Sequence, residues 1–204
     1  MISFLLRGDY EGALAVSIVL VLAIALHEFG HALAADLQGD RTPRLAGRLT
    51  LNPMAHLDPV GTFCLVLVGF GWGKPVSFSP PSLRFKRAGA AIVAIAGPAM
   101  NILLALIGAA LFVRATPGTF MSRFAQELLI LDVLLAIFNL IPIPPLDGSR
   151  LLTIFLPPSK QNVIYFLDKW GFLILLAIIF LAERPLLWMT GVVVRLILSF
   201  FGPF

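Results

Sequence analysis

Charged residues are scarce in this chain of 204 residues. They make up 13% of it, about half the share of roughly 25% that is usual in soluble domains. Hydrophobic residues make up 59%, and the mean hydropathy is +0.95. A soluble fold of this length could not bury so much apolar surface. The composition therefore excludes an ordinary soluble domain and predicts a protein whose solvent is the lipid bilayer.

Cysteine is nearly absent as well. The one cysteine, Cys64, excludes a disulfide within the chain and a cysteine-rich metal site. Polar linkers, internal repeats and low-complexity segments are also lacking. We therefore expect one integral-membrane domain over residues 1–204, with its core motifs in 20–150 and C-terminal helices in 164–201.

Long apolar runs are what the sequence has instead. Five of them are candidates to cross a bilayer, at 12–36, 88–113, 125–141, 164–182 and 186–201. A shorter, glycine-rich run at 59–72 indicates a re-entrant loop or β-hairpin, which survives at membrane depth only under a cover of protein or water. We therefore predict an all-α polytopic membrane protein with about five to six transmembrane helices. The loop or hairpin would lie between the first and second full spans.

Basic residues gather in the stretch 40–87, which holds seven Lys or Arg and two Asp. An excess of positive charge marks cytoplasmic loops. We therefore predict that 40–87 is cytoplasmic and that the N-terminus lies outside a bacterial or archaeal cell membrane. A nucleic-acid patch is the competing interpretation, but nothing else in the sequence is typical of a nucleic-acid-binding fold. We therefore expect no nucleic-acid partner.

The first apolar run contains the pattern H-E-x-x-H, from His27 to His31. Positions i and i+4 share one face of a helix, so both imidazoles can reach a single zinc ion. Glu28 can then act as general base on a water beside the metal. The alternative is a polar patch that only packs against other helices. Ionisable groups on a membrane helix are costly, however, and this favours a functional site.

A catalytic zinc site needs a third protein ligand and an open position, and the chain offers two candidates. Asp147 lies near the end of the segment 139–148. Three prolines in this segment interrupt a helix and leave backbone groups without helical hydrogen-bonding partners. His56 lies in the segment 52–59 after a short basic loop, where we expect it at or near the surface. The residues alone leave both candidates open.

Four motifs, in this order, resemble the site-2 protease family of intramembrane metalloproteases. They are His27-Glu28-x-x-His31, Gly71-Trp72-Gly73-Lys74-Pro75-Val76, Gly97-Pro98-Ala99-Met100-Asn101, and the segment from Asn139 to Leu146-Asp147-Gly148. The resemblance implies one zinc ion per chain, bound by His27, His31 and Asp147. It also implies that Glu28 is the general base. The chain would be a small form of the family, without a PDZ or nucleotide-binding regulatory domain.

The resemblance extends to residues around the zinc site. It implies that Asn101 and Asn139 face the active site and hold substrate or the developing oxyanion, and a hydrogen bond between helices is the alternative for each. His56 and Lys74 are candidates for gating or substrate contacts, and His56 could instead be structural. We expect Gly97 to serve close helix packing.

Two further features fit this scheme. The segment 71–76 resembles the family's membrane-associated strand or loop, which would pair with an extended substrate, and a structural plug beside the site is the alternative. Asp132 lies inside the run 125–141, on the same helix face as Asn139. It is expected to face the bundle as a satisfied polar residue or to line a water path.

The sequence therefore predicts a zinc endopeptidase that cleaves transmembrane segments of other membrane proteins. Its substrate would be a single-pass membrane protein in the bilayer, such as an anti-sigma factor or another protein already trimmed by a protease. A membrane metal transporter is one alternative, but it would carry acidic or histidine positions on successive helices. A non-catalytic scaffold is another, but it would have lost Glu28 or a ligand.

Overall fold

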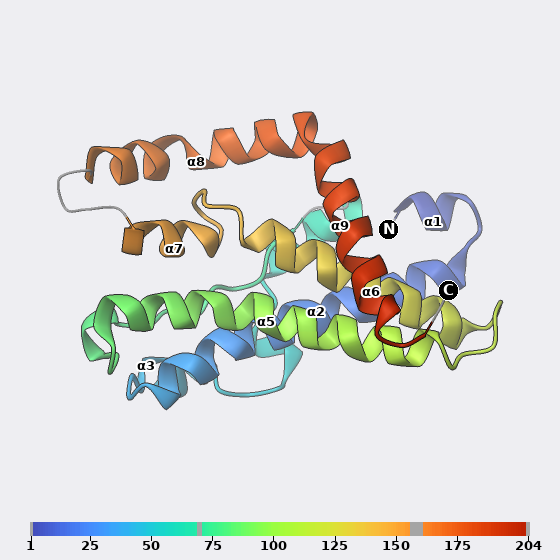
Figure 1. Ribbon diagram of the computed structural model, residues 1–204, viewed down its shortest axis with the longest axis horizontal. Helices are drawn as coiled ribbons and strands as arrows, with labels where there is room; N and C mark the ends of the chain where they lie inside the picture. Colours follow the sequence, from blue (N-terminus) through green and yellow to red (C-terminus); the bar gives the residue numbers. More distant parts are fainter. Residues whose placement is uncertain (1, 69–70, 156–160, 203–204) are drawn as a thin grey trace.

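The computed structural model describes residues 2–68, 71–155 and 161–202, and its regular elements in these ranges are all helical (Figure 1). The all-α class is thus confirmed. In chain order the elements are α1 (Ile2–Leu6), α2 (Tyr10–Leu37), α3 (Thr42–Leu45), η1 (Pro53–Ala55), α4 (Pro59–Val68), η2 (Pro80–Ser82), α5 (Lys86–Phe112), α6 (Phe120–Asn139), α7 (Gly148–Phe155), α8 (Gln161–Leu181) and α9 (Glu183–Ser199).

The expected five to six transmembrane helices are not confirmed. Within the described ranges, α2 and α5 are long and apolar enough to cross a membrane, and a third span results if α8 and α9 count as one. The bent pair turns by 78° between 165–178 and 183–199. Helix α6 coincides with the expected run at 125–141 but carries Arg123, Glu127 and Asp132 within 20 residues. These charges lower its hydropathy below that of α2 and α5.

The run 59–72, expected as a re-entrant loop or β-hairpin, starts as helix α4 and continues, beyond residues 69–70, in a non-helical segment, 71–79. Residues 69–70 lie outside the described ranges. No strand forms in the part of the chain that the structure describes, and the one antiparallel bridge found there joins Leu57 to Gly73. The β-hairpin is therefore not confirmed. A Cβ on Gly61 would lie 2.2 Å from the carbonyl oxygen of Trp72, so this glycine lets the segment fold back against α4.

Helices α2, α5 and α6 form the centre of the molecule, and α9 packs across α6 (Figure 1). Small residues let these helices approach closely. A Cβ on Gly30 of α2 would lie 2.7 Å from the carbonyl oxygen of Ala96 on α5. A Cβ on Gly108 of α5 would lie 2.7 Å from the backbone nitrogen of Leu129 on α6. Polar side chains on these three helices are therefore brought within hydrogen-bonding reach of one another.

Candidate metal centre

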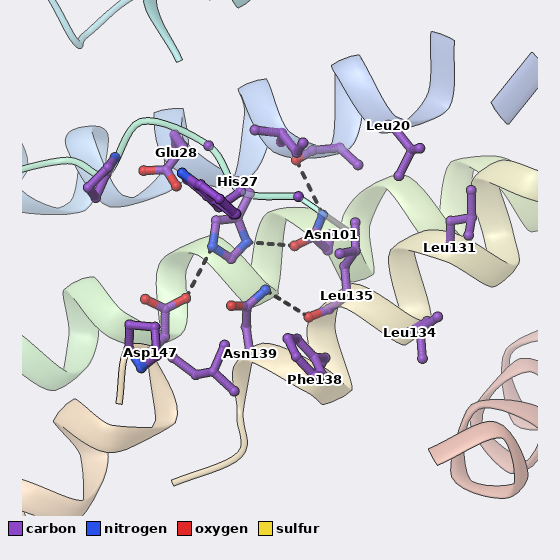
Figure 2. Close-up of a pocket in the computed structure, with 18 of the residues that line it drawn as sticks. Leu20, His27, Glu28, Asn101, Leu131, Leu134, Leu135, Phe138, Asn139 and Asp147 are labelled. Carbon is purple, nitrogen blue, oxygen red and sulfur yellow. Dashed lines mark hydrogen bonds and ion pairs between the residues drawn. The ribbon is translucent and has the colours of Figure 1, made fainter. Parts of the chain in front are cut away.

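His27 and His31 lie one turn apart on α2, and both are buried. Their Nε2 atoms are 3.1 Å apart. Oδ2 of Asp147 lies 3.1 Å from Nε2 of His27 (Figure 2). The same oxygen lies 3.2 Å from Nε2 of His31. The structure thus brings together the three residues predicted as zinc ligands. Among the described residues, no other group of three His, Cys, Asp or Glu side chains is close enough to share a metal ion.

The hydrogen-bonding partner of Nδ1 in each histidine determines which ring nitrogen carries the proton. Nδ1 of His27 is 2.7 Å from Oδ1 of Asn101, and Nδ1 of His31 is 2.7 Å from the carbonyl oxygen of Val93. These oxygens only accept hydrogen bonds, so each neutral ring carries its proton on Nδ1. The two Nε2 lone pairs therefore face Oδ2 of Asp147 with no proton between them. Such a convergence of lone pairs is repulsive unless a cation lies among them.

The donor set fits zinc. Tetrahedral zinc with ligand bonds of about 2.0–2.1 Å has its ligand atoms about 3.3–3.4 Å apart. The three distances between donor atoms here are 3.1, 3.1 and 3.2 Å. Two imidazoles and one carboxylate supply three ligands, which leaves a fourth position open, as in catalytic zinc sites.

A break after α6 carries Asp147 back to α2. The helix ends at Asn139, and the next eight residues contain three prolines, which cannot continue a helix. Gly148 then begins α7, and a Cβ at this position would lie 2.3 Å from the carbonyl oxygen of Leu140. The chain after the break therefore packs directly on the end of α6, and Asp147 is held next to the histidines.

Gly97 was expected to allow close packing of helices, but it contacts the two histidines instead. A Cβ on Gly97 would lie 2.4 Å from Nε2 of His31 and 2.7 Å from Cε1 of His27. The glycine therefore makes room for the two imidazoles, whereas close packing of α2 on α5 occurs at Gly30. Gly97 and Asn101 are four residues apart on α5 and therefore share the face that meets His27 on α2. This spacing is the sequence feature that could have indicated the role of Gly97.

Glu28 is held by the segment 71–79. Its Oε2 accepts a hydrogen bond from the backbone N–H of Val76 at 3.1 Å. Its Oε1 lies 3.4 Å from the position that a Cβ on Gly73 would occupy. The carboxylate therefore lies against this segment, and Figure 2 shows Glu28 beside His27.

The two predicted asparagines lie differently. Asn101 is fully buried: its Oδ1 faces Nδ1 of His27, and its Nδ2 donates to Oδ1 of Asp132 at 2.7 Å. For Asn101 the structure thus has the alternative arrangement, a hydrogen bond between helices. Asn139 donates from Nδ2 to the carbonyl oxygen of Leu135 at 3.0 Å and lines the cavity beside Asp147 (Figure 2). Asp132 faces the bundle and is fully buried.

His56 does not lie at the surface, and that expectation was wrong. The side chain is 0% exposed, and its Nε2 donates to the carbonyl oxygen of Thr50 at 2.8 Å. Its own carbonyl oxygen accepts from the backbone N–H of Lys74 at 2.6 Å. The side chain of Lys74 is exposed, and neither residue lines the cavity described next. These contacts fasten the loop before α4 to the segment 71–79.

A cavity of about 680 Å³ opens beside the cluster. Its walls are mainly apolar and come from α2, α6, α8, α9 and the segment 71–76, with leucines such as Leu131 and Leu134 visible in Figure 2. The polar side chains that line it are those of His27, Glu28, His31, Asn101, Asn139, Asp147, Arg150 and Glu183. An apolar chamber with a few convergent polar groups is typical of a substrate site.

Comparison with known proteins agrees with this geometry. The family model for peptidase family M50 matches residues 15–128 and 115–178. The chain is 36% identical over 170 residues to "Putative zinc metalloprotease YwhC" of Bacillus subtilis (strain 168), which covers 79% of this chain and 78% of that protein. No solved structure matches the chain significantly.

Mycobacterial relatives bear a similar name. The chain is 34% identical over 166 residues to "Putative zinc metalloprotease Rip2" of Mycolicibacterium smegmatis, covering 78% of this chain and 64% of that protein. It is 32% identical over 205 residues to the Rip2 protein of Mycobacterium tuberculosis (strain ATCC 25618 / H37Rv), covering 92% and 77%. The chain therefore belongs to peptidase family M50, the site-2 protease family, and is an integral-membrane zinc metalloprotease.

Proposed function

We propose that this zinc metalloprotease is an intramembrane endopeptidase that cleaves transmembrane segments of other membrane proteins. One observation carries the proposal: the donor atoms of His27, His31 and Asp147 converge at the wall of a mainly apolar cavity. These three residues hold one zinc ion per chain, and Glu28 is the general base. A cavity that is apolar apart from this cluster suits a substrate that arrives from the bilayer.

The proposed chemistry divides between the metal and Glu28. When bound, zinc supplies Lewis acidity toward the peptide carbonyl and lowers the pKa of a water in its open position to near neutrality. Glu28 takes the proton of the attacking water and passes it to the leaving amine. The backbone N–H of Val76 holds one carboxylate oxygen of Glu28. This contact keeps the base oriented toward the cluster.

The segment 71–76 is the proposed partner of an extended substrate. A protease must unwind a transmembrane helix before it can cut a peptide bond, and strand addition stabilises the unwound chain. Both backbone groups of Lys74 already form hydrogen bonds within the protein. Its N–H donates to the His56 carbonyl, and its carbonyl accepts from the Arg48 side chain at 3.1 Å. The segment is therefore held in place without a substrate, as a template for strand pairing must be, and a structural plug beside the site is the alternative.

Asn139 is the proposed contact to the oxyanion or to the substrate backbone. It lines the cavity, and a primary amide carries a second N–H besides the one donated to Leu135. Asn101 suits this task less well, because both ends of its amide are engaged by other side chains. We do not assign His56 or Lys74 a gating or substrate role, since neither lines the cavity.

We also propose a membrane arrangement for the single domain. Helices α2, α5, α6, α8 and α9 each cross the bilayer, with the N-terminus outside and 40–87 on the cytoplasmic side of a bacterial or archaeal cell membrane. Seven basic against two acidic residues in 40–87 support this orientation. Ser82 is exposed and suits a test. In a Cys64→Ser background, Ser82→Cys should resist an impermeant thiol reagent outside intact cells and react after permeabilisation. Labelling of intact cells would reverse the orientation.

Proteolysis in liposomes tests the function. The purified protein is reconstituted with a single-pass model substrate, and mass spectrometry locates the cut. We expect wild type to cut within the transmembrane segment and a zinc chelator to stop it. Glu28→Gln should lose about 10²–10⁴-fold in rate while it retains one zinc per chain. Glu11→Gln, an exposed position on the same helix, is the matched control with wild-type activity.

Each contrary result has its own meaning. Cuts found only outside the transmembrane segment would overturn intramembrane cleavage. Full activity in Glu28→Gln would remove Glu28 as the base. Loss of zinc from Glu28→Gln would instead make it a ligand.

A further inference from the structure

A buried line of hydrogen bonds runs behind the metal cluster from α6 through α5 to α2. Oδ1 of Asp132 accepts from Nδ2 of Asn101 at 2.7 Å, and Oδ1 of Asn101 lies 2.7 Å from Nδ1 of His27. Asp132 and Asn101 are both 0% exposed. An acidic side chain in a membrane-embedded bundle is costly. The proteolytic chemistry proposed above gives Asp132 no direct task.

The contacts of Asn101 fix which way its amide points. Its Nδ2 lies 2.7 Å from Oδ1 of Asp132 and 3.4 Å from the carbonyl oxygen of Ala23. A carbonyl oxygen can only accept, so the NH₂ end must face these two oxygens. Oδ1 of Asn101 is then left to face His27, which can meet it only by donating from Nδ1. The proton of His27 is thereby held on Nδ1, and its Nε2 lone pair faces the cluster.

We propose that Asp132 is a positioning residue for the zinc site, which acts through Asn101 to fix the tautomer and ring orientation of His27. The proposal rests on the proposed role of His27 as a zinc ligand. A reversed amide would present N–H to Nδ1 of His27 and force the proton onto Nε2. That proton would point at the other donor atoms and block the ligand.

The second histidine shows why only one needs such a device. His31 donates from Nδ1 to the backbone carbonyl of Val93, which is part of helix α5 and cannot exchange donor for acceptor. His27 meets a side-chain amide instead, whose two ends look alike in shape but differ in hydrogen bonding. Asp132 and the Ala23 carbonyl both accept from Nδ2, and Asp132 makes the shorter contact, so Asp132 contributes most to removing that ambiguity. Outer contacts of this kind usually change metal affinity by about 10–100-fold.

Zinc affinity, measured by competition with a chelator on the purified full chain, tests the proposal. Asp132→Ala should bind zinc about 10–100-fold more weakly than wild type. Asp132→Asn should recover most of the loss, because its amide oxygen can accept the same hydrogen bond. Val133→Ala is the matched control, since it truncates the next buried residue of α6 outside the line of hydrogen bonds. It should keep wild-type zinc affinity even though it packs less well.

A double-mutant cycle separates positioning from general stabilisation. If Asp132 acts through Asn101, then Asn101→Ala alone should weaken zinc binding, and adding Asp132→Ala should weaken it no further. Nitrogen-15 chemical shifts in the metal-free protein give a second readout. His27 should carry its proton on Nδ1 in wild type and populate both tautomers in Asp132→Ala.

Three results would overturn the proposal: wild-type zinc affinity in Asp132→Ala, an equal loss in Asp132→Asn and Asp132→Ala, or additive losses in the cycle. Failure of the underlying function would look different. In that case His27→Ala would bind zinc as wild type does, or wild type would bind none.

Discussion

Buried histidines occupy two regions of this protein, and their ring nitrogens are used in opposite ways. On α2, His27 and His31 each donate from Nδ1 to an oxygen, of Asn101 and Val93 respectively, and turn Nε2 toward Asp147. In the loop before α4, His56 donates from Nε2 to a backbone carbonyl. Its Nδ1 is buried and meets no hydrogen-bonding partner among the described residues.

The difference shows that burial alone does not identify a metal ligand. His56 is the most deeply buried of the three histidines, yet it serves to fasten one loop to the segment 71–79. A metal site arises where several lone pairs meet without a proton between them. His27, His31 and Asp147 meet that condition, and His56 does not.

The largest effect should come from removing the third donor. Asp147→Ala should lower the zinc content from one per chain to nearly none and reduce proteolysis to background, because two neutral imidazoles alone hold zinc weakly. Zinc is measured by elemental analysis after dialysis against a chelator. Proteolysis is measured in the liposome assay.

His56→Ala is the matching change in the other region. It should leave zinc at one per chain and lower the free energy of unfolding by about 1–3 kcal/mol, because the Thr50 carbonyl loses its donor. The opposite result, in which His56→Ala loses zinc and Asp147→Ala keeps it, would make His56 the third ligand and Asp147 a structural residue.

Two glycines of α5 offer a smaller and sharper contrast. Gly97→Ala would place a Cβ 2.4 Å from Nε2 of His31, so a ligand must move, and zinc affinity should fall by about tenfold or more. Gly108→Ala would press only on the backbone of α6 and cost about 1–3 kcal/mol of stability. It should leave zinc affinity unchanged. Equal zinc affinity in the two variants would argue that Gly97 serves packing alone.

The smallest expected effect is on the free energy of unfolding and comes from Asp40, whose carboxylate holds two loops together through hydrogen bonds. Burial alone would raise the pKa of Asp40, but hydrogen bonds from the Thr42 hydroxyl and from the backbone N–H groups of Ser79 and Thr42 hold it below its ordinary value. Because the folded pKa is depressed, the stabilisation is present above the unfolded pKa of about 3.9 and is lost as the pH falls through the folded value.

Asp40→Asn should therefore lower the free energy of unfolding at pH 7 by about 1 kcal/mol, with zinc content unchanged. Thermal unfolding in detergent at pH 7 and again below pH 4 measures the difference between variant and wild type. That difference should shrink in acid. A difference that stays constant with pH would show that the charge of Asp40 does not matter.

Much of the fold and part of the cluster of His27, His31 and Asp147 could be predicted from the sequence. Apolar runs gave the positions of α2, α5, α6, α8 and α9 to within a few residues, because helices in a bilayer need unbroken hydrophobic stretches. The i, i+4 spacing of the histidines indicated the histidine pair. The proline break made Asp147 a candidate third donor beside His56, and the resemblance to the site-2 protease family selected Asp147. Both features are local, and local features can be interpreted without knowing how helices pack.

The contacts that could not be predicted from the sequence depend on how the helices pack. Gly97 and Asn101 each contact imidazoles more than 60 positions away, and Asp132 contacts Asn101 from 31 positions away. The hydrogen bond from the backbone N–H of Lys74 to the His56 carbonyl joins residues on opposite sides of α4 in the sequence. The segment 59–72 was expected as a loop or hairpin because of its glycines, but residues 59–68 form helix α4, and Trp72 packs against Gly61 of that helix.

One spectroscopic measurement tests the central claim most directly. The chain has three histidines, so the number of imidazoles bound to zinc distinguishes the two histidine regions. X-ray absorption of the zinc-loaded protein should show two imidazole nitrogens at about 2.0–2.1 Å with oxygen ligands completing the set, and His56→Ala should give the same spectrum. A third imidazole in the wild-type spectrum that disappears in His56→Ala would contradict the account.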